Sequence, residues 1–432
     1  MKLKKIIAGT LSCLLAVTAL SACGNKQDSS SQLDSKSSGG GDKTTITYYE
    51  SSDGEIFSRA IVDAFNESQN EIYCDLQIIP NDDYDTKIKA LLSGSDDMVD
   101  VFYLRMLSQA TQFGDNGISA DLKPYMEKTS LDLTKYGVML DPVTNDDGSI
   151  YALPKTKSSW YIFYNKEIFD EANEPYPEQL TWDEYAELAK KLTIRDGDTV
   201  TQWGGYFPPW TTNLYALQQN EYLTDDDLTQ TRKSAEFLNR IYNVDKSHMD
   251  IAQMNATNSN PNPEFESGNV AMMVNGDWTF TLLNADEDNG LFDFEWDMAP
   301  LPVPEGVNEG TTVGGTSYLG INEKSNKKDA AWKFMEFFAN EGSIYIAENS
   351  SLPAYMTDEA ANVYVEATRH ESAKLVFGGD TYGEENSHPK YSEIRTAYND
   401  TLNLYLLGEI SLDDFISSLK EQREAIIDTA GN

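Results

Sequence analysis

The hydrophobic pattern of the chain changes period repeatedly near its start. Segments 44–49, 71–79 and 98–104 alternate apolar and polar residues or form short apolar runs, which predicts β-strands. Segments 56–66 and 85–93 place apolar residues at helical spacing. Strands that alternate with helices predict a parallel sheet with crossover helices, so we expect an α/β fold.

The ends of these predicted strands carry polar and aromatic side chains. In a parallel sheet, ligands bind beyond the carboxyl ends of the strands, where the chain turns toward the next helix. The candidate ligand contacts from these strand ends are Glu50, Ser51, Asp83, Tyr103 and Arg105.

Further helical patterns follow from residue 181 onward. Thr181 and Glu184 have the spacing of a capping box, which predicts a helix that runs to about Leu192 and presents Trp182 at the surface. Segment 203–210 is too rich in Gly, Pro and aromatic residues to be regular. Further helices are predicted at 229–242, 330–339, 391–407 and 412–427.

Residues 265–278 combine a helix end, a strand and a turn. Gly268 ends the predicted helix, and the apolar run 270–274 between two asparagines is typical of a buried strand. Asp277 and Trp278 then follow at the carboxyl end of that strand. Such an arrangement is common at ligand sites of open α/β sheets, but a tryptophan in this position also serves as an ordinary core residue.

This stretch resembles the signature segment of extracellular solute-binding proteins (family 1) that serve bacterial sugar ABC transporters, a group that includes maltodextrin-binding proteins. The family pattern is approximately F-x-x-G-x-x-A-M-x-x-x-G-x-W, and it is filled here by Phe265, Gly268, Ala271, Met272, Gly276 and Trp278. The resemblance implies a fold of the type II periplasmic-binding-protein class. In that fold, two α/β lobes are joined by a hinge of several crossings, and the ligand cleft lies between them. The resemblance also implies that Trp278 stacks on a sugar ring, with Asp277 beside it as a hydrogen-bonding partner.

Other segments agree with the resemblance over nearly all of residues 44–432. The pattern D-G-x-I-Y-x-L-P at 147–154 resembles the first crossing between the lobes, and M-x-P-L-P-x-P at 298–304 precedes the returning strand 313–322. The implied organisation is a lipoprotein signal peptide at 1–22, a lipidated Cys and linker at 23–43, an N-terminal lobe at 44–156 plus 314–355, and a C-terminal lobe at 157–313 plus 356–432.

The resemblance implies further ligand contacts near the crossings. They are Ser158, Trp160, Trp210, Gly314, Gly315 and Tyr355. Two of these positions have a structural alternative. Trp160 serves equally well as a packing residue of the hinge, and adjacent glycines also allow a close contact between strands.

The C-terminal part adds two expected contacts. Arg395 occupies the place where maltodextrin binders have a ring-stacking Trp. An arginine there either stacks its guanidinium plane or donates two hydrogen bonds to a hydroxyl or an acid. Alternatively, it pairs with Glu393 or Asp400 on the surface. We also expect the polar loop 377–388 to reach the cleft through Asp380 or Tyr382.

The charge of the chain narrows the classes of partner. Its formal net charge is −38, with 71 acidic and 33 basic residues scattered along the sequence. Nucleic-acid binders carry basic patches, so nucleic acid is not an expected partner, and neither is an anionic membrane surface. The 24 Tyr and 7 Trp suit a sugar site, because an aromatic face packs on the C–H face of a pyranose, although Tyr is also common in half-buried positions.

The beginning of the chain predicts export and lipidation. Three lysines precede the apolar run 6–20, and the sequence L-S-A-C that ends at Cys23 resembles a bacterial lipobox. The resemblance implies cleavage before Cys23 and a lipid anchor, palmitate included, on that residue. The Ser- and Gly-rich segment 24–43 predicts a flexible tether. Cys13 leaves with the signal peptide and Cys74 then lacks a partner, so no structural disulfide is expected.

No local motif for catalysis or metal binding occurs. The chain has no G-x-S-x-G, H-E-x-x-H or P-loop pattern, and its three histidines lie far apart, so we expect no catalytic residue, metal or cofactor. We expect a monomeric substrate-binding lipoprotein of an ABC importer, anchored on the extracellular face of the bacterial cytoplasmic membrane. Its expected partners are a carbohydrate ligand and the membrane permease subunits. A glycan-capture or adhesion lipoprotein without a transporter, and an extracellular carbohydrate-active enzyme, remain as alternatives.

Overall fold

The computed structural model describes residues 43–94, 98–208, 210, 213–257 and 259–428. The chain divides into a unit of residues 1–41 and a compact unit of residues 42–432. The predicted signal peptide, Cys23 and all but the last residue of the predicted tether lie outside the described residues, so these assignments stay predictions.

The strands of the compact unit form one large sheet and a separate antiparallel pair. Among the described residues they are β1 (Thr44–Ser51), β2 (Ile72–Ile79), β3 (Val101–Leu104), β4 (Leu153–Asn165), β5 (Ile194–Asp196), β6 (Thr199–Gln202), β7 (Met272–Gly276), β8 (Trp296–Pro300), β9 (Thr312–Ile321), β10 (Leu352–Pro353) and β11 (Thr381–Gly383). The large sheet has the order β10-β4-β9-β3-β1-β2, with β11 beside β9 and with β7 and β8 beside β4. β5 and β6 form the separate pair.

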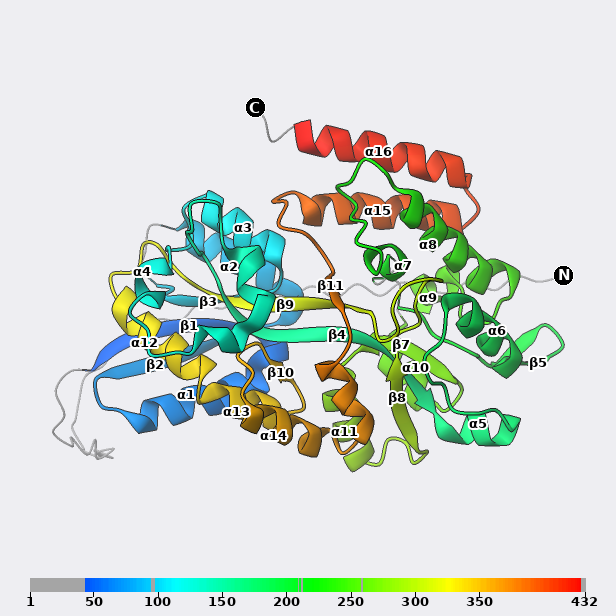
Figure 1. The fold of residues 1–432 in the computed structure, drawn as a ribbon, viewed down its shortest axis with the longest axis horizontal. Helices are drawn as coiled ribbons and strands as arrows, with labels where there is room; N and C mark the ends of the chain where they lie inside the picture. Colours follow the sequence, from blue (N-terminus) through cyan, green and yellow to red (C-terminus); the bar gives the residue numbers. More distant parts are fainter. Residues whose placement is uncertain (1–42, 95–97, 209, 211–212, 258, 429–432) are drawn as a thin grey trace, which may run out of the picture. The chain divides into compact units, whose positions relative to one another are not determined.

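Helices connect and cover these strands (Figure 1). Among the described residues they are α1 (Glu55–Ser68), α2 (Tyr84–Ser93), α3 (Leu107–Asp115), α4 (Lys123–Met126), α5 (Lys166–Ala172), α6 (Trp182–Leu192), α7 (Leu214–Leu217), α8 (Thr229–Asn239), α9 (Ile251–Thr257), α10 (Pro261–Glu266), α11 (Thr279–Asp288), α12 (Lys328–Ala339), α13 (Gly342–Glu348), α14 (Asp358–Thr368), α15 (Tyr391–Leu406) and α16 (Leu412–Asp428).

The start of the compact unit has the predicted alternation of strands and helices. β1 pairs in parallel with both β2 and β3, and α1 and α2 are the helices between them. α1 buries Phe57, Ile61 and Phe65, whose spacing places them on one face of the helix. The prediction of an α/β region with crossover helices is therefore confirmed.

Buried apolar side chains gather into separate cores. Two clusters contain residues of β1–β3 and the helices that cover them, and we call them together the N-terminal core. The largest cluster contains residues of β7, β8, α6, α8, α15 and α16, and we call it the C-terminal core. Separate cores require a connection, and the long strand β4 provides one.

β4 belongs to both cores. Its first half pairs with β9, from Leu153 opposite Leu319 to Ser159 opposite Gly314. Its second half, from Trp160 onward, pairs with β7 and β8. Figure 1 shows β4 and β9 running side by side between the two groups of helices. Residues near the middle of β4 are therefore held between the two cores.

One prediction about the C-terminal core needs correction, and another agrees with the structure. Trp182 is not at the surface: its side chain is buried, and its indole nitrogen donates a hydrogen bond to Gln218 at 2.8 Å. The capping box that starts α6 is present, so the predicted helix start is confirmed. The prediction that Trp182 faces the surface is wrong. Residues 203–208 form no regular strand or helix, as predicted, although Trp203 and Tyr206 make isolated parallel bridges to Val270 and Met273.

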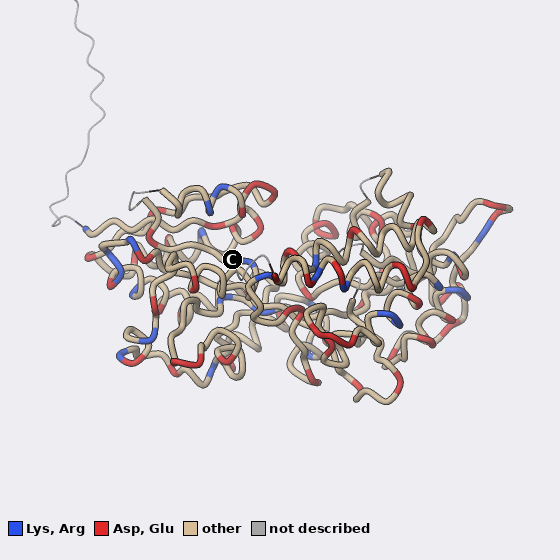
Figure 2. The backbone as a smooth tube through the Cα atoms, turned by 90° about the horizontal axis from the view of Figure 1, so that it is seen from above, with Lys and Arg blue, Asp and Glu red and all other residues tan. Residues whose placement is uncertain are grey.

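Charged residues are distributed as the sequence predicts. Figure 2 shows Asp and Glu spread over the backbone rather than gathered in one patch. Among the described residues, none of the helices is long and apolar enough to cross a membrane.

Candidate functional site

The signature segment folds as a helix end, a strand and a second helix. Gly268 follows α10 with a φ of 76°, a left-handed conformation that glycine adopts without steric cost. β7 lies antiparallel to β4, with Gly276 opposite Trp160. Asp277 and Trp278 therefore leave the strand beside the middle of β4.

Trp278 and Trp160 pack edge to face. Their ring centroids are 4.9 Å apart and their planes differ by 84°, a favourable geometry for two aromatic rings. Gly276 permits this packing, because a Cβ atom at that position would lie 2.0 Å from the Trp278 ring. Trp160 is 3% exposed, whereas Trp278 is only partly buried. Packing is thus one role of this indole pair, and direct ligand contact by Trp278 stays a prediction.

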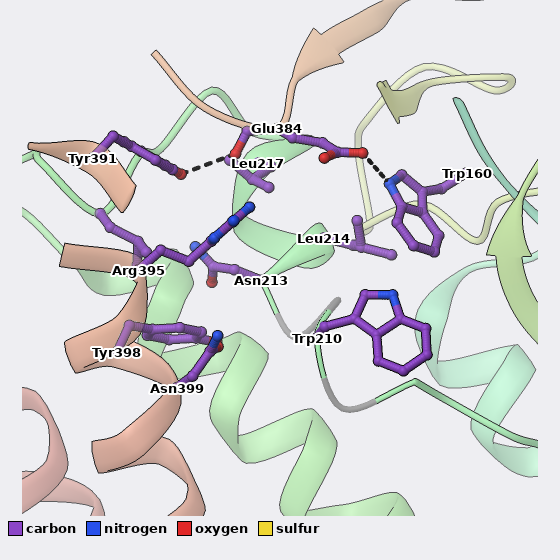
Figure 3. A pocket seen from close by; sticks show the side chains of 11 residues that line it. Trp160, Trp210, Asn213, Leu214, Leu217, Glu384, Tyr391, Arg395, Tyr398 and Asn399 are labelled. Atoms are coloured by element: carbon purple, nitrogen blue, oxygen red, sulfur yellow. Dashed lines mark hydrogen bonds between the residues drawn. The ribbon is translucent and has the colours of Figure 1, made fainter. Parts of the chain in front are cut away.

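A pocket lies beside Trp160, and we call it the α15 pocket after the helix that forms one of its walls. It contains about 410 Å³ of empty space, part of which is open solvent. Figure 3 shows its lining, which consists of Trp160, Trp210, Asn213, Leu214, Leu217, Leu223, Glu384, Tyr391, Arg395, Tyr398 and Asn399. Three of the predicted contacts, Trp160, Trp210 and Arg395, therefore meet in one pocket.

Glu384 occupies the wall of the pocket between β4 and α15. The indole nitrogen of Trp160 donates a hydrogen bond to its Oε1 at 2.6 Å, and its backbone N–H donates to the carbonyl of Gly314 at 2.9 Å. The Tyr391 hydroxyl donates to its backbone carbonyl at 2.9 Å. Burial raises the pKa of the Glu384 carboxyl, while the Trp160 hydrogen bond and the charge of Arg395 oppose this effect.

The neighbouring Glu385 joins this wall to the N-terminal core. The hydroxyl of Ser108, at the start of α3, donates a hydrogen bond to Glu385 Oε2 at 2.7 Å. Burial raises the pKa of Glu385 as well, and Ser108 and Arg395 oppose the rise. Arg395 makes a second link to the same region, because its Nη2 donates to the sulfur of Met106 at 3.2 Å.

Asp277 is buried under the connecting strands. Its backbone N–H donates to the carbonyl of Ser159 at 3.0 Å, and its Oδ2 has no hydrogen-bond partner among the described residues. Burial raises the pKa of Asp277 to about 7, and the charge of Lys157 is among the opposing influences. Asp277 does not line the α15 pocket.

Arg105, Tyr103 and Asp83 lie at the predicted strand ends of the N-terminal core. Arg105 Nη2 donates to the side-chain oxygen of Asn81 at 2.7 Å, and its guanidinium lies over the ring of Tyr103 at 5.9 Å. Asp83 is exposed and pairs with Lys87 at 2.9 Å, one turn along the chain. These residues form a polar surface separate from the α15 pocket.

Glu50 is not placed to contact a ligand. Its side chain is fully buried in an ion pair with Lys155. Its two oxygens also accept hydrogen bonds from the backbone of Ser51 at 2.9 Å and from the hydroxyls of Ser58, at 3.0 Å, and Tyr48. Both oxygens are therefore used inside the N-terminal core, and we remove Glu50 from the proposed contacts.

Three other predicted contacts also lie away from the pocket. Ser51 is buried and donates a hydrogen bond to Asn81 at 3.1 Å. Tyr355 is 5% exposed in the N-terminal core, where its ring packs against Tyr136. Asp380 is exposed, accepts a hydrogen bond from Asn308 at 3.2 Å and does not line the pocket. Ser51 and Tyr355 are also removed from the proposed contacts, because they are buried and their hydroxyls bond to Asn81 and to the backbone N–H of Asp132.

Ser158, Gly314 and Gly315 lie where β4 and β9 cross between the cores. Ser158 is opposite Gly315, and a Cβ atom at Gly314 would lie 2.4 Å from the Ser158 carbonyl. Gly314 thus allows a close contact between strands, which was one of the two alternatives. A Cβ atom at Gly315 would lie 3.3 Å from the Glu384 carboxyl group, so this glycine also leaves space for the pocket wall.

Most of the lining of the pocket, apolar and polar, was not predicted from the sequence. The missed residues are Asn213, Leu214, Leu217, Leu223, Glu384, Tyr391, Tyr398 and Asn399. The loop 377–388 was singled out, but for Asp380 and Tyr382 rather than Glu384. Two adjacent acids after a short extended segment were the available signal, because neighbouring residues of an extended chain point in opposite directions.

Metal binding and the reactivity of Cys74 are the two remaining features, and neither points to a reactive site within the described residues. Among the described residues, no group of three or more His, Cys, Asp and Glu side chains is arranged to hold a metal ion. Cys74 is a buried free thiol, and burial raises its pKa, which disfavours the reactive thiolate.

Comparison with known sequences identifies relatives. A sequence profile described as bacterial extracellular solute-binding protein matches residues 50–344. An arabinooligosaccharide-binding protein of Halalkalibacterium halodurans is 27% identical over 44% of this chain and 47% of its own length. A maltotriose-binding protein of Pyrococcus abyssi is 24% identical over 54% of this chain and 49% of its own length. The match thus spans about half the length of these curated relatives.

Solved structures share the fold. A sugar transporter protein of Rhizobium etli in an open conformation superposes with a TM-score of 0.78 at 24% identity, covering 88% of this chain and 99% of the other. An ABC substrate-binding protein of Listeria monocytogenes in complex with cycloalternan gives 0.77 at 25% identity, covering 90% and 100%. These likenesses confirm the predicted fold of the type II periplasmic-binding-protein class. The profile covers more than half of the chain, and the protein therefore belongs to the family of bacterial extracellular solute-binding proteins.

Proposed function

We propose that this protein captures a sugar or oligosaccharide between two lobes and delivers it to the permease of an ABC importer. The α15 pocket is the observation that carries the proposal. Its lining combines four aromatic rings with an acid, an arginine and two asparagines. Aromatic surfaces with a few convergent polar groups are typical of carbohydrate sites. Family membership and two relatives named for oligosaccharides support the same conclusion.

The side chains of the pocket suit the two kinds of surface that a sugar presents. Trp210 is 49% exposed, so its indole has a face available for the C–H side of a sugar ring. Glu384 accepts hydrogen bonds from hydroxyl groups, and Arg395 donates them. These polar partners matter because a buried hydroxyl left unpaired costs about 1–3 kcal/mol.

The two lobes of the proposal follow the two cores. Residues 44–156 with 314–355 form the N-terminal lobe, and residues 157–313 with 356–432 form the C-terminal lobe. β4 and β9 connect the cores, which supports a hinge at their middle. Binding would favour the closed arrangement by rotation about this hinge. Asp83, Tyr103 and Arg105 would then approach the ligand from the N-terminal lobe, with Ser158, Gly314, Gly315, Asp277, Trp278 and Asp380 as further proposed contacts.

The proposal includes a lipid anchor. Cleavage before Cys23 and acylation of its thiol would hold the monomeric protein at the extracellular face of the cytoplasmic membrane, next to the permease subunits. Segment 24–43 would act as the tether. Loss of membrane association after Cys23→Ala, with intact binding in solution, is the expected result of a fractionation experiment.

Calorimetry tests the binding function. We expect a neutral oligosaccharide from a panel of malto-, manno- and arabino-oligosaccharides to bind with a Kd on the order of micromolar, about −8 kcal/mol. Trp210→Ala should weaken that binding, whereas Tyr73→Ala should not, because Tyr73 is a comparably exposed aromatic residue on β2. A folded protein that binds none of these sugars would contradict the proposal.

A further inference from the structure

Arg395 alone would suggest an anionic ligand. A guanidinium group presents a planar fork of donors that matches a carboxylate or a phosphate. Its hydrogen bond to the Met106 sulfur engages a weak acceptor, so most of its donor capacity stays available to other groups. The charges around it therefore decide which ligands the α15 pocket can hold.

Two partly buried glutamates lie near Arg395. Glu384 lines the same pocket as Arg395, and Glu385 and Arg395 bond to Ser108 and Met106, which are close neighbours in the chain. Burial raises the pKa of both glutamates, and the charge of Arg395 opposes the rise. Arg395 and Glu384 both line the α15 pocket, so a ligand there can meet a donor and an acceptor at once. With both acids ionised, this group of three side chains carries a net charge of −1.

Glu384 has one oxygen committed and one oxygen available. Trp160 holds Oε1 at 2.6 Å, which fixes the orientation of the carboxyl group. Figure 3 shows the carboxyl of Glu384 and the guanidinium of Arg395 extending into the space bordered by Trp160 and Trp210. A carboxylate with one free oxygen accepts hydrogen bonds but donates none, so it selects ligands that carry hydroxyl groups.

We propose that Glu384 makes the α15 pocket select uncharged sugars over acidic ones, with Arg395 already balanced by Glu384 and Glu385 and thus unable to favour an acidic sugar. The inference rests on the proposed sugar-binding function and narrows it to glycans without acidic groups. A sugar hydroxyl would bridge the gap by donating to Glu384 and accepting from Arg395. A uronate would place its carboxylate next to two acids, and like charges disfavour such contacts.

Calorimetry with chemically matched trisaccharides tests the proposal. The probes are maltotriose, mannotriose and arabinotriose as neutral sugars and trigalacturonate as the acid. We expect one or more neutral probes to bind and trigalacturonate to bind at least about 100-fold more weakly. Glu384→Gln should weaken the neutral complex about 10- to 100-fold, because a hydrogen bond to a charged acceptor contributes about 1.5–3 kcal/mol.

Glu393→Gln is the matched control. Glu393 lies near the start of α15, is half exposed and pairs with Lys390 at 2.8 Å, so its loss of charge should leave affinity unchanged. Circular dichroism and thermal unfolding of both variants separate a loss of fold from a loss of specificity.

A double variant should gain affinity for the acidic sugar. Glu384→Gln together with Glu385→Gln leaves the charge of Arg395 unbalanced, so trigalacturonate should bind at least about 10-fold more tightly than it does to the original protein. Misfolding does not produce such a gain.

The outcomes separate the two proposals. Binding of trigalacturonate by the original protein that equals or exceeds its binding of the neutral sugars would overturn the inference, and so would unchanged neutral-sugar affinity in Glu384→Gln. In either case the sugar-binding function would still stand. Absence of binding to every probe would overturn both proposals.

Discussion

Two glutamates near the connecting strands can be compared directly, one fully buried and one partly buried. Glu50 lies near the end of β1 in the N-terminal core, and Glu384 directly follows β11 beside the C-terminal core. Each lies near a basic side chain, Lys155 for Glu50 and Arg395 for Glu384. Both oxygens of Glu50 are taken by protein partners, whereas Glu384 keeps one oxygen toward a pocket.

The difference lies in how far the surrounding protein satisfies each charge. A buried charge costs free energy unless partners compensate for it, so complete compensation indicates a structural role. Incomplete compensation beside empty space leaves hydrogen-bonding capacity that a ligand can use. By this criterion Glu50 supports the fold, and Glu384 is the candidate ligand contact.

The largest expected effect comes from breaking the Glu50 pair. Lys155→Met leaves the Glu50 carboxylate buried without its cation, which should lower the free energy of unfolding by about 3–5 kcal/mol. Urea denaturation measures this change. Glu50→Gln combined with Lys155→Met should recover much of the loss, because the double variant leaves no buried charge unpaired.

An exposed pair provides the control for this prediction. Lys333 and Glu71 lie 3.0 Å apart with exposed side chains, so Lys333→Met should change stability by only about 0–1 kcal/mol. A loss of similar size in Lys155→Met and Lys333→Met would mean that the Glu50 pair has no special structural role.

The same comparison explains what the sequence could and could not reveal. Periodicity located β1, α1 and the helices α15 and α16, because one face of each is apolar and buried. Periodicity says that a position is near the end of a strand, but it does not say what the side chain meets there. Glu50 was therefore chosen and Glu384 missed, since their roles depend on Lys155 and Trp160, which lie far away in sequence.

Aromatic residues show the same limit. The sequence pattern correctly placed Trp278 after a buried strand, but its contact with Trp160 depends on the register of β7 against β4. Trp182 was expected at the surface, yet tertiary packing buries it and its indole nitrogen bonds to Gln218. Register and packing between distant segments are properties of the folded chain, and local sequence patterns carry little information about them.

Asp277 extends the comparison to a buried acid without an ion pair. Its expected effect is a pH-dependent change in the free energy of unfolding, smaller than that of Lys155→Met. Its pKa is raised to about 7 in the folded protein, above the ordinary range of an aspartate. A raised pKa means that protonation stabilises the folded state, so this contribution is complete at low pH and is lost as the pH rises through about 7. From pH 5 to pH 8 the original protein should lose about 2 kcal/mol of unfolding free energy relative to Asp277→Asn.

Chemical denaturation at several pH values measures the difference. The nearby titratable groups are Lys157, Tyr161 and Tyr364, and Tyr161→Phe serves as a control that keeps the acid. Parallel pH profiles for the original protein and Asp277→Asn would show that the carboxyl titrates in its ordinary range, and Asp277 would then resemble a solvated acid rather than a buried one.

The orientation of Glu384 is the next point to test. Trp160→Phe removes the indole N–H that holds Oε1, so the carboxyl should lose its fixed orientation and the affinity for a neutral sugar should fall about tenfold. Trp182→Phe removes an equivalent indole hydrogen bond in the same core but away from the pocket, and it should leave affinity unchanged. Equal affinity losses in the two variants would attribute the effect to core packing instead of Glu384.

The smallest expected effect concerns the link between the pocket wall and the N-terminal core. Ser108 donates to Glu385 at 2.7 Å, and Glu385 is adjacent to Glu384, so this bond helps to set the position of the wall. Ser108→Ala should reduce sugar affinity about threefold, the lower end of the contribution of one hydrogen bond, as measured by calorimetry. Ser119→Ala is the control, because Ser119 is also buried but its hydroxyl lacks a partner among the described residues. If Ser108→Ala binds as tightly as Ser119→Ala, then Glu384 is positioned by Trp160 and the backbone of Gly314 alone, and Glu385 acts only through its charge.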